Sequence, residues 1–183
     1  MADADTRPAT PADAEELARI QLTTWRTAYE AILPAEVLDG MDVASTAAAW
    51  LQAIDYGTVF VATEGDWLVG FVSAGPAPRT ESADAKGNPP ADADTVALVG
   101  TLLVEPRWGR RGHGGRLLAA AAEAMRDRGS TRGIAWVPEA DNASLGFYRR
   151  AGWQPDGTVR TLDAGGRPLR ELRVSGGLDL ELA

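Results

Sequence analysis

The chain has 183 residues, of which 45% are hydrophobic, and this favours one ordinary globular domain over residues 1–183. Its formal net charge of −8 argues against a nucleic-acid or membrane-surface binder, because no basic face dominates. The chain has no cysteine and one histidine, His113. This composition excludes disulfides, thiol nucleophiles and metal sites built from cysteine or several histidines, so we expect no metal.

The start of the chain, MADADTRPATPADAEE, is acidic and lacks the apolar core of a signal peptide. No apolar run approaches the roughly 20 residues that a membrane helix needs. We therefore expect a cytoplasmic protein.

The first third of the chain predicts a short edge strand in TRPAT and then helices. Thr10 and Pro11 are typical of a helix start, because threonine caps free amides and proline suits the first helical position. This helix is expected to run to about Tyr29. Trp25 and Tyr29 lie four residues apart on one face, so they either pack in the core or line a substrate cleft. A short helical turn and a helix over 43–54 follow.

The middle of the chain predicts a hairpin and then a loop. TVFVAT and DWLVGFVSAG are strand-like runs joined by a short glycine-containing connection. Residues of about 76–94 are dense in proline, alanine and acid, so we expect a mobile loop there. Near the end of the chain, TVRTLD and PLRELRVSG flank an AGGR turn and predict a final hairpin.

Between these hairpins, strands and helices alternate. The apolar run VALVGTLLVEP predicts a buried strand, RWGRRGHGG a glycine-rich turn, and LLAAAAEAMRDRG a helix. A second buried strand and a second helix, which ends at a glycine, follow in IAWVPEADNASLGFYRRAGW. This alternation indicates an α/β or α+β domain in which the turn after a strand holds a ligand.

The glycine-rich turn has the chemistry of a phosphate site. Glycines let the backbone approach a ligand, and the start of the helix offers unpaired amides at its positive end. The turn also carries the arginines that an acidic protein needs to hold an anion, at positions 107, 110, 111 and 116. The alternative is a plain turn with solvated arginines. A Walker loop is excluded because Arg116 and Leu117 follow Gly115, and GHGGRL does not fit a dinucleotide fingerprint.

These residues resemble the GCN5-related N-acetyltransferase (GNAT) superfamily. Its acetyl-coenzyme A (acetyl-CoA) signature matches LLVEPRWGRRGHGGRLLAAA, with Gly112 and Gly114 as the motif glycines, and WVPEADNASLGFYRRAGW is similar to its fifth strand and following helix. The N-terminal region is also similar to that of many bacterial members. The resemblance implies an α/β (α+β) GNAT fold, with a mixed, mostly antiparallel sheet that splays between its fourth and fifth strands and is flanked by helices.

The same resemblance implies that an acetyl group passes from acetyl-CoA to a primary amine of a small molecule or peptide, by direct attack in a ternary complex. The acceptor is expected near Trp25, Tyr29 and the loop before Asp94, and the family suggests a homodimer. Main-chain amides are expected to bind acetyl-CoA: its thioester and pantetheine arm at Leu102, Leu103 and Val104, and its pyrophosphate at Arg110, Arg111, Gly112, His113, Gly114 and Gly115.

Tyr148 matches the family tyrosine that protonates the departing thiolate, a step that a positioned phenol can perform. The alternative is that Tyr148 is a core aromatic beside Phe147. For His113, packing at the helix start is a better interpretation than catalysis.

The sequence departs from the family pattern in three places. Asp141 stands where the family commonly has an asparagine, and Asn142 lies one position later. We expect both residues near the pantetheine arm, to which an ionised aspartate cannot donate a hydrogen bond. Gly109 replaces the leading Gln or Arg of the motif. Leu98 stands where many relatives carry the basic glutamate, so the base is unassigned; the candidates are Glu105, Glu139 and Asp141, or a water chain.

Two other functions stay open. The departures at Leu98 and Asp141 are compatible with a non-catalytic module that binds or senses acyl-CoA. A different phosphate-bearing cofactor is the third hypothesis.

Overall fold

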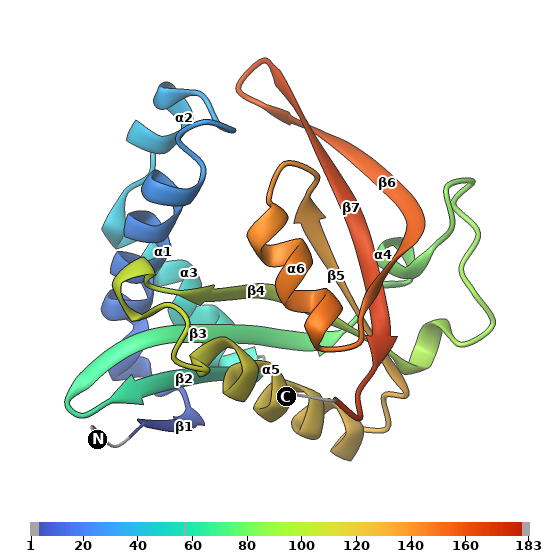
Figure 1. The fold of residues 1–183 in the computed structure, drawn as a ribbon, viewed down its shortest axis with the longest axis horizontal. Coiled ribbons are helices and arrows are strands. Elements are labelled where there is room, and N and C mark those ends of the chain that lie inside the picture. Colours follow the sequence, from blue (N-terminus) through green and yellow to red (C-terminus); the bar gives the residue numbers. More distant parts are fainter. Residues whose placement is uncertain (1–3, 57, 181–183) are drawn as a thin grey trace.

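A seven-stranded mixed sheet organises the fold, and the computed structural model describes it over residues 4–56 and 58–180 (Figure 1). The strand order is β1-β2-β3-β4-β5-β7-β6, and every neighbouring pair is antiparallel except β4 and β5. The strands are β1 (Ala4–Pro8), β2 (Thr58–Glu64), β3 (Trp67–Pro76), β4 (Val96–Val104), β5 (Arg132–Pro138), β6 (Gln154–Ala164) and β7 (Arg167–Gly177).

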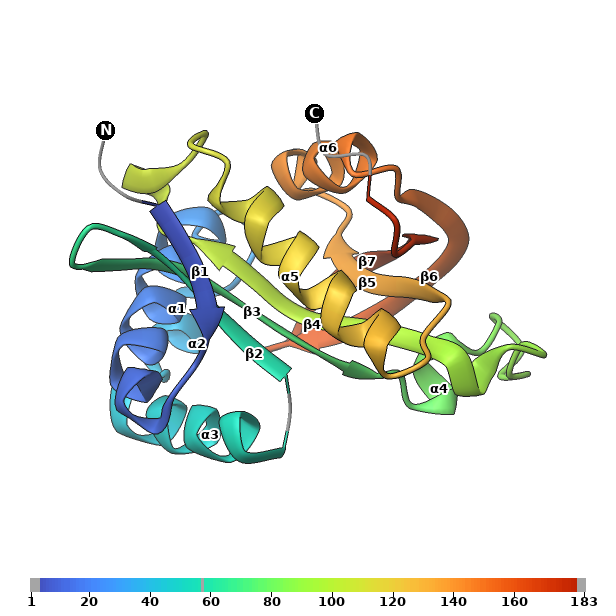
Figure 2. The ribbon, with the colours of Figure 1, turned by 90° about the horizontal axis from the view of Figure 1, so that it is seen from below.

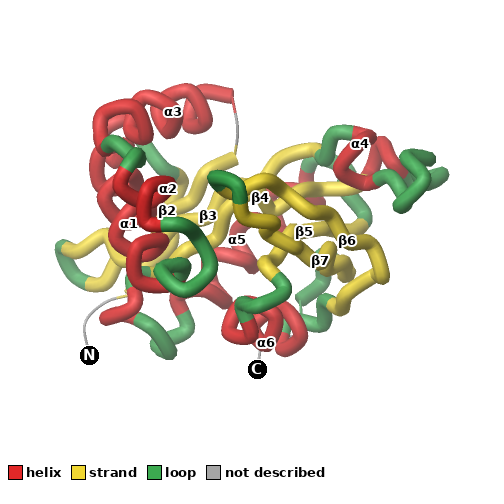
Figure 3. Tube along the Cα trace, turned by 90° about the horizontal axis from the view of Figure 1, so that it is seen from above, coloured by secondary structure: helices red, strands yellow, loops and turns green. Residues whose placement is uncertain are grey.

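Helices cover both faces of the sheet (Figure 2). The cluster around α1 and α3 packs on one face of β2 and β3, and α5 packs on the other face. Viewed from above, α1, α2 and α3 lie to one side of β4, while β5, β6 and β7 lie to the other (Figure 3). The helices are α1 (Ala14–Ala28), α2 (Ala35–Asp39), α3 (Val43–Tyr56), α4 (Arg79–Ser82), α5 (His113–Asp127) and α6 (Asn142–Arg150), with 3-10 turns at Pro11–Asp13, Ala93–Thr95 and Pro106–Trp108.

The sheet opens between its two parallel strands. β4 pairs with β5 only over Val96–Val99, opposite Arg132–Ala135, and beyond these residues each strand keeps only its outer partner. The register of β4 against β3 shifts at the same place, where Gly100 is the extra residue of a bulge. The predicted splay at a bulge is therefore confirmed, and the opening leaves one edge of β4 available to a ligand.

A buried tryptophan, Trp153, packs against the β5–β7 half of the sheet. Trp153 is fully buried and lies against Gly133 of β5 and Gly176 of β7, where an added Cβ would stand 2.3 Å and 2.2 Å from its ring. Its indole N–H donates to the carbonyl of Gly177 at 2.9 Å. These strand glycines are therefore required by the close approach of the ring.

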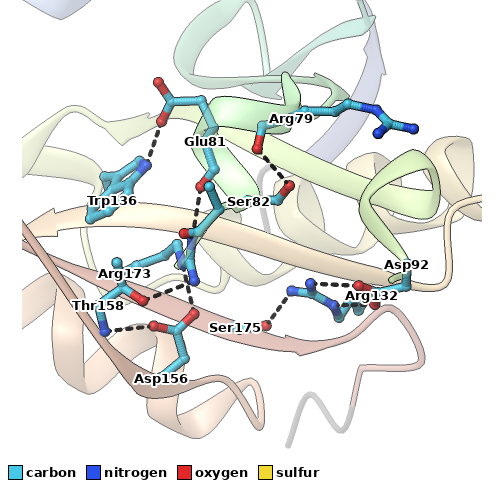
Figure 4. A network of polar contacts seen from close by, with 11 residues as sticks. Arg79, Glu81, Ser82, Asp92, Arg132, Trp136, Asp156, Thr158, Arg173 and Ser175 are labelled. Carbon is cyan, nitrogen blue, oxygen red and sulfur yellow. Dashed lines mark hydrogen bonds and ion pairs between the residues drawn. The ribbon is translucent and has the colours of Figure 1, made fainter. Parts of the chain in front are cut away.

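The segment 76–94 differs from the prediction of a loop without regular structure. It contains the helical turn α4, and Ser82, Ala83 and Ala93 are buried. Figure 4 shows how polar contacts order it: Arg173 of β7 donates to the carbonyls of Glu81 and Ala83, at 2.9 Å and 2.6 Å. The sequence composition predicted too little apolar burial for order, but a buried arginine supplies the anchoring instead. Mobility of this segment stays a prediction.

The other predicted elements are present with boundaries within a few residues. At the start of the first helical segment, the Asp13 carboxylate accepts from the backbone N–H of Thr10 at 2.7 Å and from its hydroxyl at 2.9 Å, and α1 ends one residue before Tyr29. Gly65 and Gly166 take positive φ in the two hairpin turns, at 59° and 83°. Across the described ranges, no helix combines the length and apolarity needed to cross a membrane.

Candidate active site

A cavity of about 350 Å³ occupies the opening between β4 and β5. Its walls come from four parts of the chain that are distant in sequence: the α1–α2 region, the end of β4, the end of β5 with α6, and the β6–β7 hairpin. The lining residues are Trp25, Tyr29, Ile32, Leu33, Val37, Met41, Val99, Gly100, Thr101, Leu102, Leu103, Trp136, Val137, Pro138, Ser144, Tyr148, Leu162, Asp163, Ala164, Leu169 and Glu171.

Tyr148 of α6 lines this cavity although its side chain is almost entirely buried, at 6% exposure. Its ring stacks on Trp153, with centroids 5.4 Å apart and planes 24° apart, and meets the edge of Phe147. Burial, with a smaller contribution from Tyr29, raises the pKa of Tyr148 well above its ordinary value. The phenol therefore stays protonated at neutral pH and is able to donate a proton or a hydrogen bond.

Trp25 and Tyr29 both line the cavity, and their rings meet edge to face with centroids 5.9 Å apart. Burial, followed by the negative charges of Asp141 and Glu171, raises the pKa of Tyr29 to about 12. Of the two interpretations that the sequence allowed, lining a cleft agrees with the structure. The segment before Asp94, in contrast, contributes no residue to the cavity lining.

The glycine-rich turn before α5 has a backbone suited to an anion. Arg110 and Gly112 take positive φ, at 63° and 82°, and Gly112 is the residue from which α5 starts. Left-handed residues directly before a helix turn successive amide N–H groups toward one side, where the helix dipole also favours negative charge. For Arg110, a residue with a Cβ, this conformation costs about 1–2 kcal/mol.

Side chains beneath the turn hold it in place. Glu64 of β2 contacts both Arg111, at 2.7 Å, and the Nε2 atom of His113, at 2.8 Å. Arg116 donates to His113 Nδ1, so Nε2 carries the proton and donates to Glu64. His113 is 1% exposed, which agrees with packing at the helix start and leaves only its main chain for a ligand.

Gly114 brings the start of α5 against the cavity wall. An added Cβ would lie 3.2 Å from the Phe147 ring and 3.8 Å from Leu102. Leu102 and Leu103 line the cavity, whereas Val104 packs against the core beneath α5. The start of α5, the free edge of β4 and the second half of α6 therefore meet in one place.

The two polar residues at the start of α6 have different surroundings. Asp141 caps the helix: its carboxylate accepts from the backbone N–H of Ser144 at 3.0 Å and from the Ser144 hydroxyl at 2.7 Å. Asn142 is the exposed first residue of the helix. Neither lines the cavity, although the charge of Asp141 acts on Tyr29.

Two of the three acids considered as bases, Glu105 and Glu139, lie outside the cavity lining, as Asp141 does. Glu105 is buried between Arg19 and Arg107, at 3.0 Å and 2.9 Å. Burial alone would raise the pKa of Glu105, but the two arginines outweigh it and hold the pKa below its usual range. Glu139 is half-exposed and paired with Arg170 at 2.9 Å. The structure therefore does not bring either carboxylate to the cavity.

A carboxylate that sequence reasoning missed does line the cavity. Glu171, in the middle of β7, is 9% exposed, and its Oε2 atom accepts from Arg160 of β6 at 2.6 Å. The only signal in the sequence was an acid inside the strand PLRELRV, on the same face as Leu169 and Arg173. That face could not be assigned to a cleft without the opening of the sheet.

Trp136, also missed, connects the cavity with segment 76–94. Its indole N–H donates to Glu81 at 2.6 Å, and Arg160 lies 4.3 Å from the centre of its ring (Figure 4 shows Trp136 and Glu81). Arg160 also donates to Glu81 at 2.9 Å. Within the described ranges, no group of three or more acids and histidines is placed to hold a metal ion.

The splayed mixed sheet and the glycine-rich turn are the features expected of an acetyltransferase. A model of the Acetyltransferase (GNAT) family matches residues 17–153, three quarters of the chain, and the chain belongs to this family. An uncharacterized N-acetyltransferase, YuaI of Bacillus subtilis, is 29% identical over 137 residues, which cover 75% of this chain and 72% of YuaI.

Solved structures show the same fold at low sequence identity. The acetyltransferase yncA of Salmonella typhimurium, determined with acetyl-CoA, superposes with a TM-score of 0.70 at 19% identity, over 98% of this chain and 96% of its own. The PaiA N-acetyltransferase of Thermoplasma acidophilum, determined with coenzyme A, gives 0.67 at 16% identity, over 96% and 99%.

Proposed function

We propose that this protein is an N-acetyltransferase that transfers the acetyl group of acetyl-CoA to a primary amine, of a small molecule or peptide, by direct attack in a ternary complex. The observation that carries this proposal is a cavity in the opening of the sheet that contains the buried phenol Tyr148, beside the glycine-rich turn of α5. Membership of the family and the two relatives determined with coenzyme A or acetyl-CoA support it.

The residues present fit acetyl-CoA. The left-handed turn at Arg110 and Gly112 and the first amides of α5 would hold the pyrophosphate. The edge of β4 around Leu102 and Leu103, which has no strand partner beyond Val99 on the β5 side, would hold the pantetheine arm. When bound, acetyl-CoA supplies an acetyl group activated as a thioester.

The chain itself then has two tasks. The cavity walls hold the amine against the thioester carbon and keep water away. Because the two reactants are already positioned, the reaction does not need a bimolecular encounter in solution. Tyr148 donates its proton to the sulfur atom that leaves, and its raised pKa keeps that proton in place until then.

Calorimetric titration with acetyl-CoA, coenzyme A and ATP, followed by a thiol-release assay over a panel of amines, tests the proposal. Selective binding of acetyl-CoA with amine-dependent thiol release is the expected result. Binding without release for any amine would favour the acyl-CoA-sensing alternative, and equal binding of ATP would favour another phosphate-bearing cofactor.

A further inference from the structure

Charge is unevenly distributed around the cavity. Glu171 and Asp163 are the carboxylates that line it, and no lysine, arginine or histidine lies among the lining residues of the described chain. Asp141, at the start of α6, acts on the nearby Tyr29 as a further negative charge. An acceptor with a carboxylate or phosphate group would therefore find no cation in these walls and several anions.

The ion-pair cluster of Glu171, Arg160 and Glu81 carries a net negative charge. Its partner Arg160 is shared with a second carboxylate, Glu81, at 2.9 Å, so one guanidinium stands between two acids. Only Oε2 of Glu171 accepts from Arg160. Oε1 has no hydrogen-bond donor within residues 4–56 and 58–180, and it is not among the fully buried unpaired atoms, so it is open to a donor from a ligand or water.

The remainder of the cavity suits an apolar body. Trp25, Tyr29 and Trp136 supply aromatic surface, and the other walls are largely aliphatic. The β6–β7 turn closes the cavity against α2: an added Cβ at Gly165 would lie 2.6 Å from Val37. Because the same 350 Å³ must also admit the end of the pantetheine arm, the space left for the acceptor is small.

From these observations, and resting on the proposed function, we infer that the acceptor is a small primary amine with an apolar body and no anionic group, and that Glu171 binds its ammonium. The carboxylate of Glu171 accepts a hydrogen bond from the amine nitrogen, while aromatic rings receive the body and favour the cation. The ammonium first gives one proton to Glu171, which frees the lone pair of the nitrogen. The N–C bond then forms and the C–S bond breaks, while nitrogen loses its second proton to solvent and sulfur gains the Tyr148 proton. Exchange with water then restores both groups.

A matched pair of ligands tests this inference without altering the protein. Phenylalaninol and phenylalanine differ in that one carries a hydroxymethyl group where the other carries a carboxylate. We expect phenylalaninol to bind at least about tenfold more tightly in direct titrations, with and without coenzyme A, and to be acetylated with the higher kcat/KM. Equal or tighter binding of phenylalanine overturns the inference, as does the absence of phenylalaninol binding.

The variant Glu171→Gln identifies the residue responsible. It should weaken phenylalaninol binding about tenfold and reduce the discrimination against phenylalanine, while acetyl-CoA affinity stays unchanged. Glu139→Gln is the matched control, since that carboxylate is paired with the neighbouring Arg170 outside the cavity lining. Unchanged amine affinity in a folded Glu171→Gln protein overturns the role of Glu171. If that variant does not fold, Glu171→Asp, which keeps the charge but shortens its reach, should weaken phenylalaninol binding while the discrimination against phenylalanine remains; unchanged phenylalaninol affinity in it overturns the role of Glu171.

These measurements separate this inference from the proposed function. Loss of the proposed function would appear as a protein that does not bind acetyl-CoA or release thiol. The titrations with phenylalaninol and phenylalanine need neither event, so they decide the chemistry of the acceptor independently.

Discussion

The proposed cofactor side and the proposed acceptor side of the cavity are built in different ways. The cofactor side comes from one continuous stretch, from β4 through the glycine-rich turn into α5, and presents mainly backbone groups. The acceptor side is assembled from α1, α2, β5 and the β6–β7 hairpin, and presents side chains. Backbone geometry tolerates changes in side chains, whereas a wall of side chains changes its chemistry with each substitution.

Tyr148 stands where the two sides meet, and its removal should have the largest effect. Tyr148→Phe deletes the proton donor but keeps the ring that stacks on Trp153. We expect kcat to fall at least about 100-fold, with acetyl-CoA affinity unchanged. Thiol-release kinetics and calorimetry measure the two quantities, and Tyr56→Phe, at a residue that is 91% exposed, is the control. Full turnover in the variant would show that the sulfur is protonated by another group.

Two adjacent glycines test how the position of Trp153, whose ring stacks on Tyr148, is fixed. Gly176→Ala would put a Cβ 2.2 Å from the Trp153 ring, whereas Gly177→Ala meets no atom within 4 Å. We expect the first substitution to lower the free energy of unfolding by about 1–3 kcal/mol and the second to have almost no effect. Urea denaturation of both variants measures this difference. Similar stabilities would mean that Trp153 repacks without cost and does not fix the position of Tyr148.

The signals in the sequence for the proposed cofactor side are local. Gly112 and Gly114 lie where an apolar run is followed by the start of a helix, and together with the neighbouring arginines they indicated an anion site. The acceptor side was predicted only in part. Trp25 and Tyr29 share a helix face and line the cavity, but Glu171 could be recognised only once β7 was placed beside β5 at the opening of the sheet.

Segment 76–94 illustrates a second limit of the sequence. Composition indicates how much apolar surface a segment can bury. For this segment, that surface is too small to offset the conformational entropy lost on ordering. Its order comes instead from Arg173, which lies 90 residues beyond Ala83 along the chain and is 6% exposed. Polar anchors of this kind carry no periodic pattern, so they become visible only in the folded structure.

The acceptor side can be perturbed alone at the β6–β7 turn. Gly165 and Gly166 both take positive φ, but only a Cβ at Gly165 would meet Val37, at 2.6 Å. Gly165→Ala should therefore push the turn away from α2 and raise the KM of the amine a few-fold, with acetyl-CoA affinity unchanged. Gly166→Ala carries the same backbone strain without the contact and serves as the control. Equal KM values for the two variants would mean that this contact does not shape the acceptor site.

The cofactor side can be perturbed alone at Glu64, with the smallest expected effect. Glu64→Gln removes the charge that holds Arg111 and His113 beneath the turn. Ordering the turn around pyrophosphate then costs more free energy, so acetyl-CoA affinity should fall a few-fold while amine binding is unchanged.

The hydrogen bond from His113, with that from Arg111, lowers the pKa of Glu64. Its hold on the turn is therefore complete at neutral pH and is lost as the pH falls through that lowered value. Calorimetry between neutral pH and pH values below the ordinary glutamate range should show acetyl-CoA affinity decreasing more steeply in the native protein than in Glu64→Gln. Parallel pH profiles would assign the support of the turn to the backbone and to Arg116 instead.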